Sequence, residues 1–284
     1  MSIPAAEPER SDATRELAER ALVWLLHELG EAAPNIVLLG GLVPALLTSG
    51  QTPPAPRHLG TTDVDVLLIT HVDIAGESGL HEVEHALKSL GFSDVQDGWR
   101  WRGPVDRVPV KFEFLCDVDE HESGAFVRPQ GCAELAALNV RGARYVAMDF
   151  DERELPGTSA GGDAFSVAVR VAGLGGYLLA KACALRDRAL AKDYYDFAYV
   201  LIHNRVGGPE KAADLIGSGV LAQELPGLRS VMLEVRERFR KTSDDGPRRF
   251  AEESLKVDPA LDASRVRADA VTAVSSFMNR LNPA

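Results

Sequence analysis

Two aspartates two residues apart, Asp63 and Asp65, carry the clearest chemical signal in the sequence. They open the apolar run 63–69, which is typical of a β-strand. Side chains at i and i+2 of a strand point to the same face, so both carboxylates project together while Val64 and Val66 pack behind them. Like charges held this close repel unless a positive charge lies between them. The pair therefore predicts a divalent cation, Mg²⁺ or Mn²⁺, and metal-dependent phosphate chemistry.

A third carboxylate is expected from a neighbouring strand, because two metal ions on a phosphate are usually held by a small set of carboxylates. The segment Val108–Leu115 alternates apolar and polar residues, as a half-buried strand does. Glu113 lies on its polar side together with Lys111, and is the preferred third metal ligand or base. Asp117 is the second choice, since it is expected to fall beyond the end of the strand.

A glycine turn precedes the aspartate pair. Gly40 and Gly41 stand between a predicted buried strand at 35–39 and a predicted short helix at 41–47. Backbone amides in such a turn can approach phosphate oxygens, with the helix N-terminus adding a favourable potential. Many strand-to-helix turns use glycine for steric reasons alone, so the turn by itself is weak evidence for a phosphate site. The Asp-x-Asp strand that follows it makes this evidence stronger.

The segment between the turn and the aspartates contains three prolines over 51–58 and is expected to be an irregular loop. His58 ends this loop and is expected to be solvent-exposed, with a contact to nucleotide or acceptor as the other interpretation. Thr62 is a candidate for a hydrogen bond to phosphate. Either Thr61 or Thr62 could equally cap the turn into the strand.

Cations in the second half of the chain form a second candidate cluster. Lys181, Leu185, Arg188 and Lys192 follow 4-3-4 spacing, so a continuous helix would place three cations on one face, where they would suit a triphosphate. The competing interpretation is a solvated basic face. Its balancing acids would be Asp187, Asp193 and Asp196.

Together these segments resemble a known family. Leu38-Leu39-Gly40-Gly41-Leu42 followed by Thr61-Thr62-Asp63-Val64-Asp65 is similar to the signature of the DNA polymerase β-like nucleotidyltransferase superfamily. The segment 179–188, followed by Lys192-Asp193-Tyr194-Tyr195-Asp196, resembles the Lys…Arg…Lys/Arg-Asp-x-x-Asp pattern of the AbiEii/MenT group of toxin-like members. The similarity covers roughly residues 35–203. One departure is the 21 residues between Gly41 and Asp63, which is longer than in typical members.

The resemblance implies a nucleotidyltransferase that moves an NMP group from an NTP to an acceptor hydroxyl, with pyrophosphate leaving. It implies that Asp63 and Asp65 bind Mg²⁺ and that Gly40 and Gly41 contact the nucleotide phosphates. It also implies that Lys181 and Asp193 complete the active site. By resemblance the acceptor is the 3′ end of a tRNA. A protein hydroxyl or a small molecule such as an aminoglycoside is also open. The resemblance further implies a toxin of a toxin–antitoxin system, with an antitoxin as a candidate partner.

The alternative function is a non-catalytic module that binds a nucleotide or a partner protein on the same fold. The intact carboxylate pair argues against it, because an unused pair would carry its repulsion without benefit. A kinase is not supported, since the sequence has no Gly-x-x-x-x-Gly-Lys-Ser/Thr loop and no His-Arg-Asp segment.

The expected fold is α+β: a nucleotidyltransferase-like mixed sheet flanked by helices, followed by a mostly helical C-terminal domain that completes the cleft. The domains are expected at 1–155 and 165–284, with the Gly-rich stretch 156–162 as a linker or exposed loop. Strands are expected at 63–69, 99–102, 107–116 and 141–150. Helices are expected at 11–29, 81–90, 173–190, 192–204, 209–217, 225–241, 246–256 and 262–281.

Composition bounds the remaining possibilities. The 284 residues carry a net charge of −11, which argues against tight, non-specific binding of long nucleic acid and weakens the tRNA acceptor. No apolar run approaches the roughly 20 residues that span a bilayer, and the N-terminus lacks the pattern of a signal peptide. With three widely spaced cysteines read as reduced thiols, we expect a cytoplasmic protein without a membrane partner. Trp24, Trp99 and Trp101 are assigned to packing.

Overall fold

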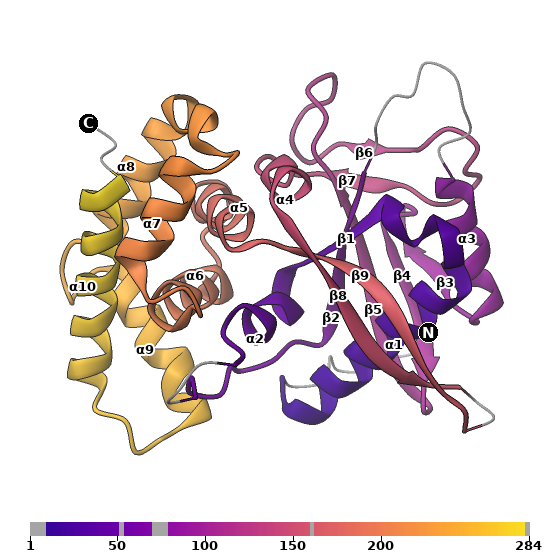
Figure 1. Ribbon diagram of the computed structural model, residues 1–284, viewed down its shortest axis with the longest axis horizontal. Helices are drawn as coiled ribbons and strands as arrows, with labels where there is room; N and C mark the ends of the chain where they lie inside the picture. The colour runs from indigo at the N-terminus through magenta and orange to yellow at the C-terminus, as the bar shows by residue number, and fades with distance from the viewer. Residues whose placement is uncertain (1–9, 51–53, 70–78, 160–161, 282–284) are drawn as a thin grey trace, which may run out of the picture.

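The computed structural model describes residues 10–50, 54–69, 79–159 and 162–281. A mixed β-sheet with flanking helices forms one side of the molecule, and a group of helices from the second half of the chain forms the other (Figure 1). The fold is therefore α+β, as the sequence predicts. The expected absence of a signal peptide concerns residues 1–9, which lie outside the described residues.

The part of the chain that the structure describes contains one nine-stranded sheet, with strands ordered β3-β4-β5-β2-β1-β9-β8 and with β7 and β6 continuing from β5. The parallel pairs are β2–β5, β1–β9 and β5–β7, and the others are antiparallel. The strands are β1 (Ile36–Leu39), β2 (Asp63–Leu68), β3 (Ser93–Gln96), β4 (Arg100–Val105), β5 (Val108–Cys116), β6 (Phe126–Val127), β7 (Ala137–Asn139), β8 (Phe150–Thr158) and β9 (Ala164–Ala172).

Strand β2 occupies the centre of the sheet, between β1 and β5, and this position decides where the aspartates lie. Val64 and Val66 are fully buried, whereas Asp63 and Asp65 are only partly so, which confirms the alternation expected along this strand. On β5, Phe112 and Phe114 are fully buried and Glu113 is partly exposed, which confirms the alternation there as well. The polar residues of both central strands thus share one face.

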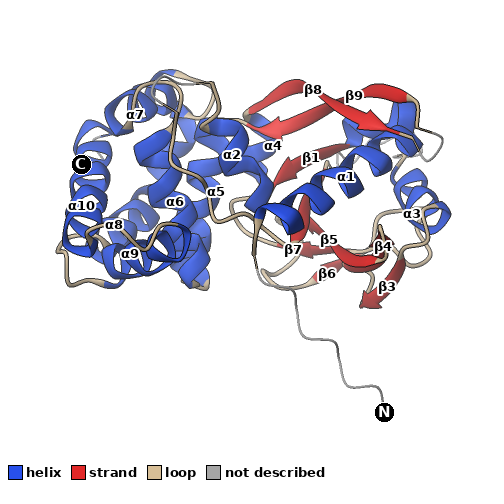
Figure 2. Cartoon of the chain, turned by 90° about the horizontal axis from the view of Figure 1, so that it is seen from below, coloured by secondary structure: helices blue, strands red, loops and turns tan. Residues whose placement is uncertain are grey.

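The opposite face of the sheet packs against α1 (Asp12–Leu29), with α3 (Leu80–Ser89) beside it (Figure 2). Helix α1 begins where expected, because Ser11 caps it in a capping box with Thr14. It ends before Gly30, which takes φ +49. Its apolar stripe fills the core behind the carboxylates, so this helix fixes the sheet without entering the polar face.

The helices expected in the second half are present, with boundaries that differ by a few residues. Helix α5 begins directly after β9 and lies next to the sheet (Figure 1). The predicted helix at 225–241 is divided into a 3₁₀ segment at Ala222–Leu228 and α8. The helices are α5 (Leu174–Asp187), α6 (Ala191–His203), α7 (Pro209–Ser218), α8 (Arg229–Arg238), α9 (Asp245–Val257) and α10 (Ala263–Leu281).

The prediction of a strand at 141–150 is wrong. Residues Arg144–Met148 form a short helix, α4, and β8 begins only at Phe150. Asp117 explains the difference, because its carboxylate accepts hydrogen bonds from the backbone N–H groups of Gly142 and Arg144 and holds the chain in a turn. Helix α4 then lies over the ends of β1 and α5 and becomes part of the candidate site.

The Gly-rich stretch 156–162 does not behave as a linker where it is described. Residues 156–158 continue β8, which pairs with β9 over nine residues on each strand. Residues 160 and 161 lie outside the described residues. The sheet therefore runs on to Ala172, past the expected end of the first domain at residue 155.

No helix among the described residues is long and apolar enough to cross a membrane. The three cysteines, all in the described parts of the chain, are buried and free.

Candidate active site

Asp65 of β2 and Glu113 of β5 lie directly opposite each other in the parallel pair. Asp63 takes the corresponding position opposite Lys111. The structure thus brings together the three carboxylates that the sequence singled out, on the polar face of the two central strands.

The glycine turn packs on Asp65. Gly40 has φ +74, and a Cβ added there would overlap the carboxylate of Asp65. The N–H of Gly41 lies 3.4 Å from Asp65 Oδ2, and a Cβ on Gly41 would lie 2.6 Å from Thr61 Oγ1. Both glycines are therefore needed to let the turn approach the strand that carries the aspartates.

The environment of Glu113 shifts the pKa of its carboxyl group strongly. Burial and the negative charge of Asp65, with a smaller effect of Asp63, raise its pKa to about 7 against the opposing charge of Arg100. Arg100 Nη2 lies 2.7 Å from Glu113 Oε1, and Arg100 Nε donates to the same oxygen at 2.9 Å. A carboxyl group with a pKa near neutrality can accept and release a proton at physiological pH.

Asp63 is neutralised by a neighbour on the next strand. Lys111 Nζ lies 3.0 Å from Asp63 Oδ1, and the Thr62 hydroxyl donates to the same oxygen at 3.2 Å. Thr62 therefore contacts the aspartate rather than standing free for phosphate, while Thr61 lines the adjacent pocket. Sequence reasoning placed Lys111 beside Glu113 but did not find its pairing with Asp63, which depends on the register between β2 and β5.

Asp117, the second choice for the third carboxylate, has a different role. Its side chain is fully buried and is bound by the guanidinium groups of Arg141 and Arg144 as well as by two backbone N–H groups. Both oxygens of the Asp117 carboxylate accept hydrogen bonds from residues 141–144, and they hold this segment in place before α4. It therefore positions Arg141, which lines the pocket.

Lys181 lies in a buried ion-pair network. Its Nζ donates to Asp196 Oδ2 at 2.7 Å and to Asp193 Oδ1 at 3.2 Å. Burial alone would lower the pKa of Lys181, but the charges of Asp196 and Asp193 outweigh it and raise the pKa above its usual value. In turn, the charge of Lys181 overcomes the effect of burial and lowers the pKa of both aspartates.

Asp193 is fully buried and also accepts two hydrogen bonds from Arg188, at 2.9 Å each. It does not line the pocket that Lys181 and Arg188 line. Its contacts are those of a residue that orients the two cations.

The continuous cationic stripe expected from the 4-3-4 spacing is not formed. Helix α5 ends at Asp187, Ala189 takes φ +48, and Lys192 belongs to α6. Leu185, which the spacing placed on the same face, is fully buried. The bend nevertheless brings Lys181, Arg188 and Lys192 to the wall of one pocket.

His58 is buried, contrary to the expectation for a loop histidine. Its Nε2 lies 3.1 Å from Asp196 Oδ1, and its Nδ1 accepts a hydrogen bond from Gly60 N–H at 3.2 Å. These partners place the ring proton on Nε2. Its ring packs against Tyr195 and Tyr199 of α6. The end of the Pro-rich loop therefore packs against α6 through His58. Residues 51–53 of this loop lie outside the described residues.

A pocket of about 840 Å³, part of it open to solvent, lies between the sheet and α5. On its polar wall the carboxylates lie next to the cations. The residues that line the pocket come from β1, β2, β5, β7, α4, α5 and α6 as well as from loops. Asp63, Thr62 and Asp193 do not line this pocket. The polar lining consists of Arg10, Thr61, Asp65, Glu113, Arg141, Lys181, Arg188, Lys192 and Asp196.

Among the described residues, no three His, Cys, Asp or Glu side chains are arranged so as to hold a metal ion. The ion pairs explain this, because Lys111 holds Asp63 and Arg100 holds Glu113. The chemistry of the donors still fits Mg²⁺ or Mn²⁺, since all three are carboxylates, the oxygen ligands that these ions prefer. Binding would require the two cations to give way.

No family model matches the chain, and no curated protein or solved structure matches it either.

Proposed function

We propose that the protein is a metal-dependent nucleotidyltransferase that moves an NMP group from an NTP to an acceptor hydroxyl. One observation carries this proposal: Asp65 and Glu113 face the same pocket as Lys181, Arg188 and Lys192. Nucleotidyl transfer needs a carboxylate pair opposite a group of cations. The carboxylates hold the metal ions, and the cations balance the negative charge of the triphosphate beside them.

Glu113 is the residue best suited to act as base. The acceptor oxygen forms a bond to the α-phosphorus, the bond to the leaving pyrophosphate breaks, and the proton of the acceptor hydroxyl passes to the Glu113 carboxylate. Its pKa of about 7 lets it take up this proton near neutrality. Lys181 and Lys192 bind the phosphates, and Arg188 supplies a further charge-assisted donor.

Asp63 and Asp65 would hold the divalent ions, which supply charge neutralisation on the transferring phosphate and on the attacking and leaving oxygens. Glu113 would be the third ligand only instead of being the base, because a carboxylate bound to a divalent ion does not keep a pKa near 7. When no ion is bound, Lys111 pairs with Asp63 and Arg100 pairs with Glu113, which relieves part of the repulsion among the three carboxylates. Asp193 and Asp196 orient Lys181.

For the acceptor, the resemblance to AbiEii/MenT toxins favours the 3′ end of a tRNA, with an antitoxin as partner and a cytoplasmic location. The net charge of −11 points instead to a protein or small-molecule hydroxyl. Arg10 and Arg141 at the pocket provide local positive charge for an RNA end, which is the observation in favour of the tRNA.

The direct test is incubation with each α-labelled NTP and Mg²⁺ or Mn²⁺, against total RNA, a protein lysate and small hydroxyl compounds. Transfer of label by the wild type and its loss in Asp65→Asn is the expected result. The absence of labelling with any acceptor would contradict an enzyme, and labelling that persists in Asp65→Asn would contradict the proposed site.

The second candidate is a non-catalytic nucleotide-binding or partner-binding module. The pairs Lys111–Asp63 and Arg100–Glu113 favour it, because they neutralise the carboxylates without a metal. In that case an NTP would bind equally well with Mg²⁺ and with EDTA. An enzyme of the proposed kind would bind it more weakly in EDTA.

A further inference from the structure

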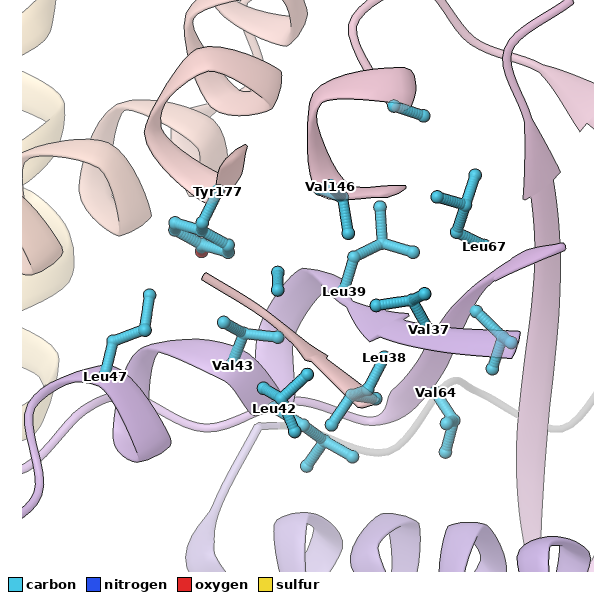
Figure 3. Packing of buried hydrophobic residues seen from close by; sticks show 14 of the residues in the cluster. Val37, Leu38, Leu39, Leu42, Val43, Leu47, Val64, Leu67, Val146 and Tyr177 are labelled. Carbon is cyan, nitrogen blue, oxygen red and sulfur yellow. The ribbon is translucent and has the colours of Figure 1, made fainter. Parts of the chain in front are cut away.

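The pocket has an apolar part that neither the metal nor the triphosphate requires. Its side chains are aliphatic. They come from the ends of β1, β5 and β7, from α4 and from the loop before α4. Figure 3 shows Leu39 and Val146 of this group in one cluster with Tyr177 of α5. The apolar lining residues are Leu39, Leu115, Leu138, Val140, Ala143 and Val146.

Two buried hydrogen-bonding groups at the same pocket lack a partner. Trp99 and Tyr177 line it and are only 8% and 1% exposed. Within the described residues, neither Trp99 Nε1 nor Tyr177 Oη has a hydrogen-bond partner. Both atoms are covered by neighbouring groups in the structure, so a ligand in the pocket reaches them only when the side chains around them move. Buried polar groups are nearly always satisfied, so two orphans beside one pocket point to such a ligand.

The other two tryptophans show that this is a property of the pocket. Trp101 Nε1 donates to the carbonyl of Gly98 at 2.8 Å, and Trp24 Nε1 donates to the carbonyl of Thr158 at 3.3 Å. The assignment of all three tryptophans to packing is therefore incomplete, because Trp99 alone among them combines a pocket position with an unused donor.

Helix α5 leaves room opposite the apolar wall. Tyr177, Ala180 and Ala184 lie at i, i+3 and i+7 and all line the pocket. Lys181 follows on the same helix, with its Nζ 5.7 Å from the centroid of the Tyr177 ring. Tyr177 therefore stands where the apolar part of the pocket meets the charged part.

We propose that this apolar part binds the nucleoside of the NTP: its base lies against Leu138, Val140 and Val146, and accepts a hydrogen bond from Trp99 Nε1. A nucleobase is flat and apolar on its faces, with carbonyl oxygens or ring nitrogens on its edge, which matches this wall and this donor. Tyr177 Oη meets the ribose, between the base and the phosphates at Lys181. The inference rests on the proposed nucleotidyltransferase function and adds the location of the nucleoside.

Calorimetric titration without turnover tests the inference. The ligands are the α,β-methylene analogues of the four NTPs and inorganic tripolyphosphate, each with Mg²⁺. Trp99→Phe keeps a ring under Arg100, whose guanidinium carbon lies 4.4 Å from the indole centroid, and removes only the donor and part of the ring. Ala184→Leu fills the space on α5. The matched controls are Trp24→Phe, and Ala268→Leu on the exposed side of α10.

At least one analogue is expected to bind the wild type more tightly than tripolyphosphate does. Trp99→Phe should weaken that analogue about tenfold, the size of one hydrogen bond. Ala184→Leu should weaken it further. Both variants should bind tripolyphosphate like the wild type, which also shows that they are folded, and the two controls should change neither ligand.

Each other result overturns the inference in a distinguishable way. If no analogue binds more tightly than tripolyphosphate, the nucleoside site is absent and the proposed function stands. If neither ligand binds, the proposed function fails and the inference with it. If Trp99→Phe and Ala184→Leu leave the analogues unchanged but weaken binding of an RNA 3′ end, the apolar part belongs to the acceptor.

Discussion

Asp65 and Glu113 lie at the same register position of the parallel strands β2 and β5, so two carboxylates stand side by side at the wall of the pocket. Like charges placed directly opposite destabilise a sheet. Arg100 relieves part of this repulsion, and burial together with the charges of Asp65 and Asp63 still raises the pKa of Glu113. A site that is destabilised without its ligand is a typical property of binding and catalytic centres.

Replacing Glu113 by Gln should therefore stabilise the metal-free protein in a pH-dependent way. The folded-state pKa of about 7 lies above the ordinary value of 4.5, so the folded state binds more protons and stability falls as pH rises through this window. The difference corresponds to about 3 kcal/mol above pH 7. Glu113→Gln should recover much of this at pH 8 and little at pH 5.

Urea unfolding in EDTA at the two pH values measures the effect. Glu134→Gln is the matched control, because that carboxylate is exposed and forms only a surface pair with Lys88. An equal gain for Glu113→Gln at both pH values would show that Glu113 is not strained by charge.

The glycine turn offers a second test, through backbone conformation. Gly40→Ala combines a positive φ of +74 with overlap of the new Cβ and the Asp65 carboxylate. Gly50→Ala is the control, since Gly50 has φ +79 but no other residue that the structure describes comes within 4 Å of its added Cβ. Strain alone costs about 1–2 kcal/mol. We expect Gly40→Ala to exceed Gly50→Ala by at least that much in the free energy of unfolding, and also to weaken NTP binding.

The polar face of the site follows from local pattern, whereas its pairing does not. Period-two alternation predicts that Asp63, Asp65 and Glu113 point away from the core, and the burial of Val64 and Phe112 confirms it. That Asp65 meets Glu113 and that Lys111 meets Asp63 depends on the register of two strands about fifty residues apart in the chain. No local feature of the sequence specifies that register.

The strands β8 and β9 show a different limit. Pro156 and Gly157 indicate a turn, but β8 is the last strand of the sheet, where a residue without an N–H is tolerated. Strand β9 carried a usable signal, because Val167, Val169 and Val171 alternate with smaller or polar residues. Helices such as α7, α9 and α10 were predictable because each has its own apolar stripe, whereas α5 is buried on most of its sides. The bend after α5 was missed, since nothing in the 4-3-4 spacing shows that Ala189 takes a positive φ.

Lys181 should prove essential for stability as well as for activity. Lys181→Met leaves Asp193 and Asp196 buried without their main counter-charge, and removing one partner of a buried pair costs about 3–5 kcal/mol. Lys256→Met, which removes an exposed partner of Glu253, should cost less than about 1 kcal/mol.

The double variant Lys181→Met/Asp196→Asn separates the two roles of Lys181. It should regain part of the free energy of unfolding, because one of the uncompensated charges is gone, yet remain inactive in NMP transfer. The single variant should recover stability as pH falls, since its buried aspartates then become protonated. Restored transfer in the double variant would show that Lys181 does not bind the phosphates.

His58 connects the segment before the aspartates to the cation network, and its removal should disturb both. His58→Phe keeps an aromatic ring beside Tyr195 and Tyr199 but removes the donor to Asp196 and the acceptor for Gly60 N–H. Leaving these buried groups unsatisfied should cost about 1–3 kcal/mol each. His58→Gln can still donate to Asp196 and should lose less. If Asp196 turns away from Lys181 in His58→Phe, the affinity of the protein for tripolyphosphate should fall several-fold. If His58 has only a structural role, His58→Phe should lower the free energy of unfolding and leave the affinity of the folded protein for tripolyphosphate unchanged. Urea unfolding and calorimetric titration on the same two variants measure these quantities separately, and equal tripolyphosphate affinity in the wild type and His58→Phe would rule out a positioning role for His58.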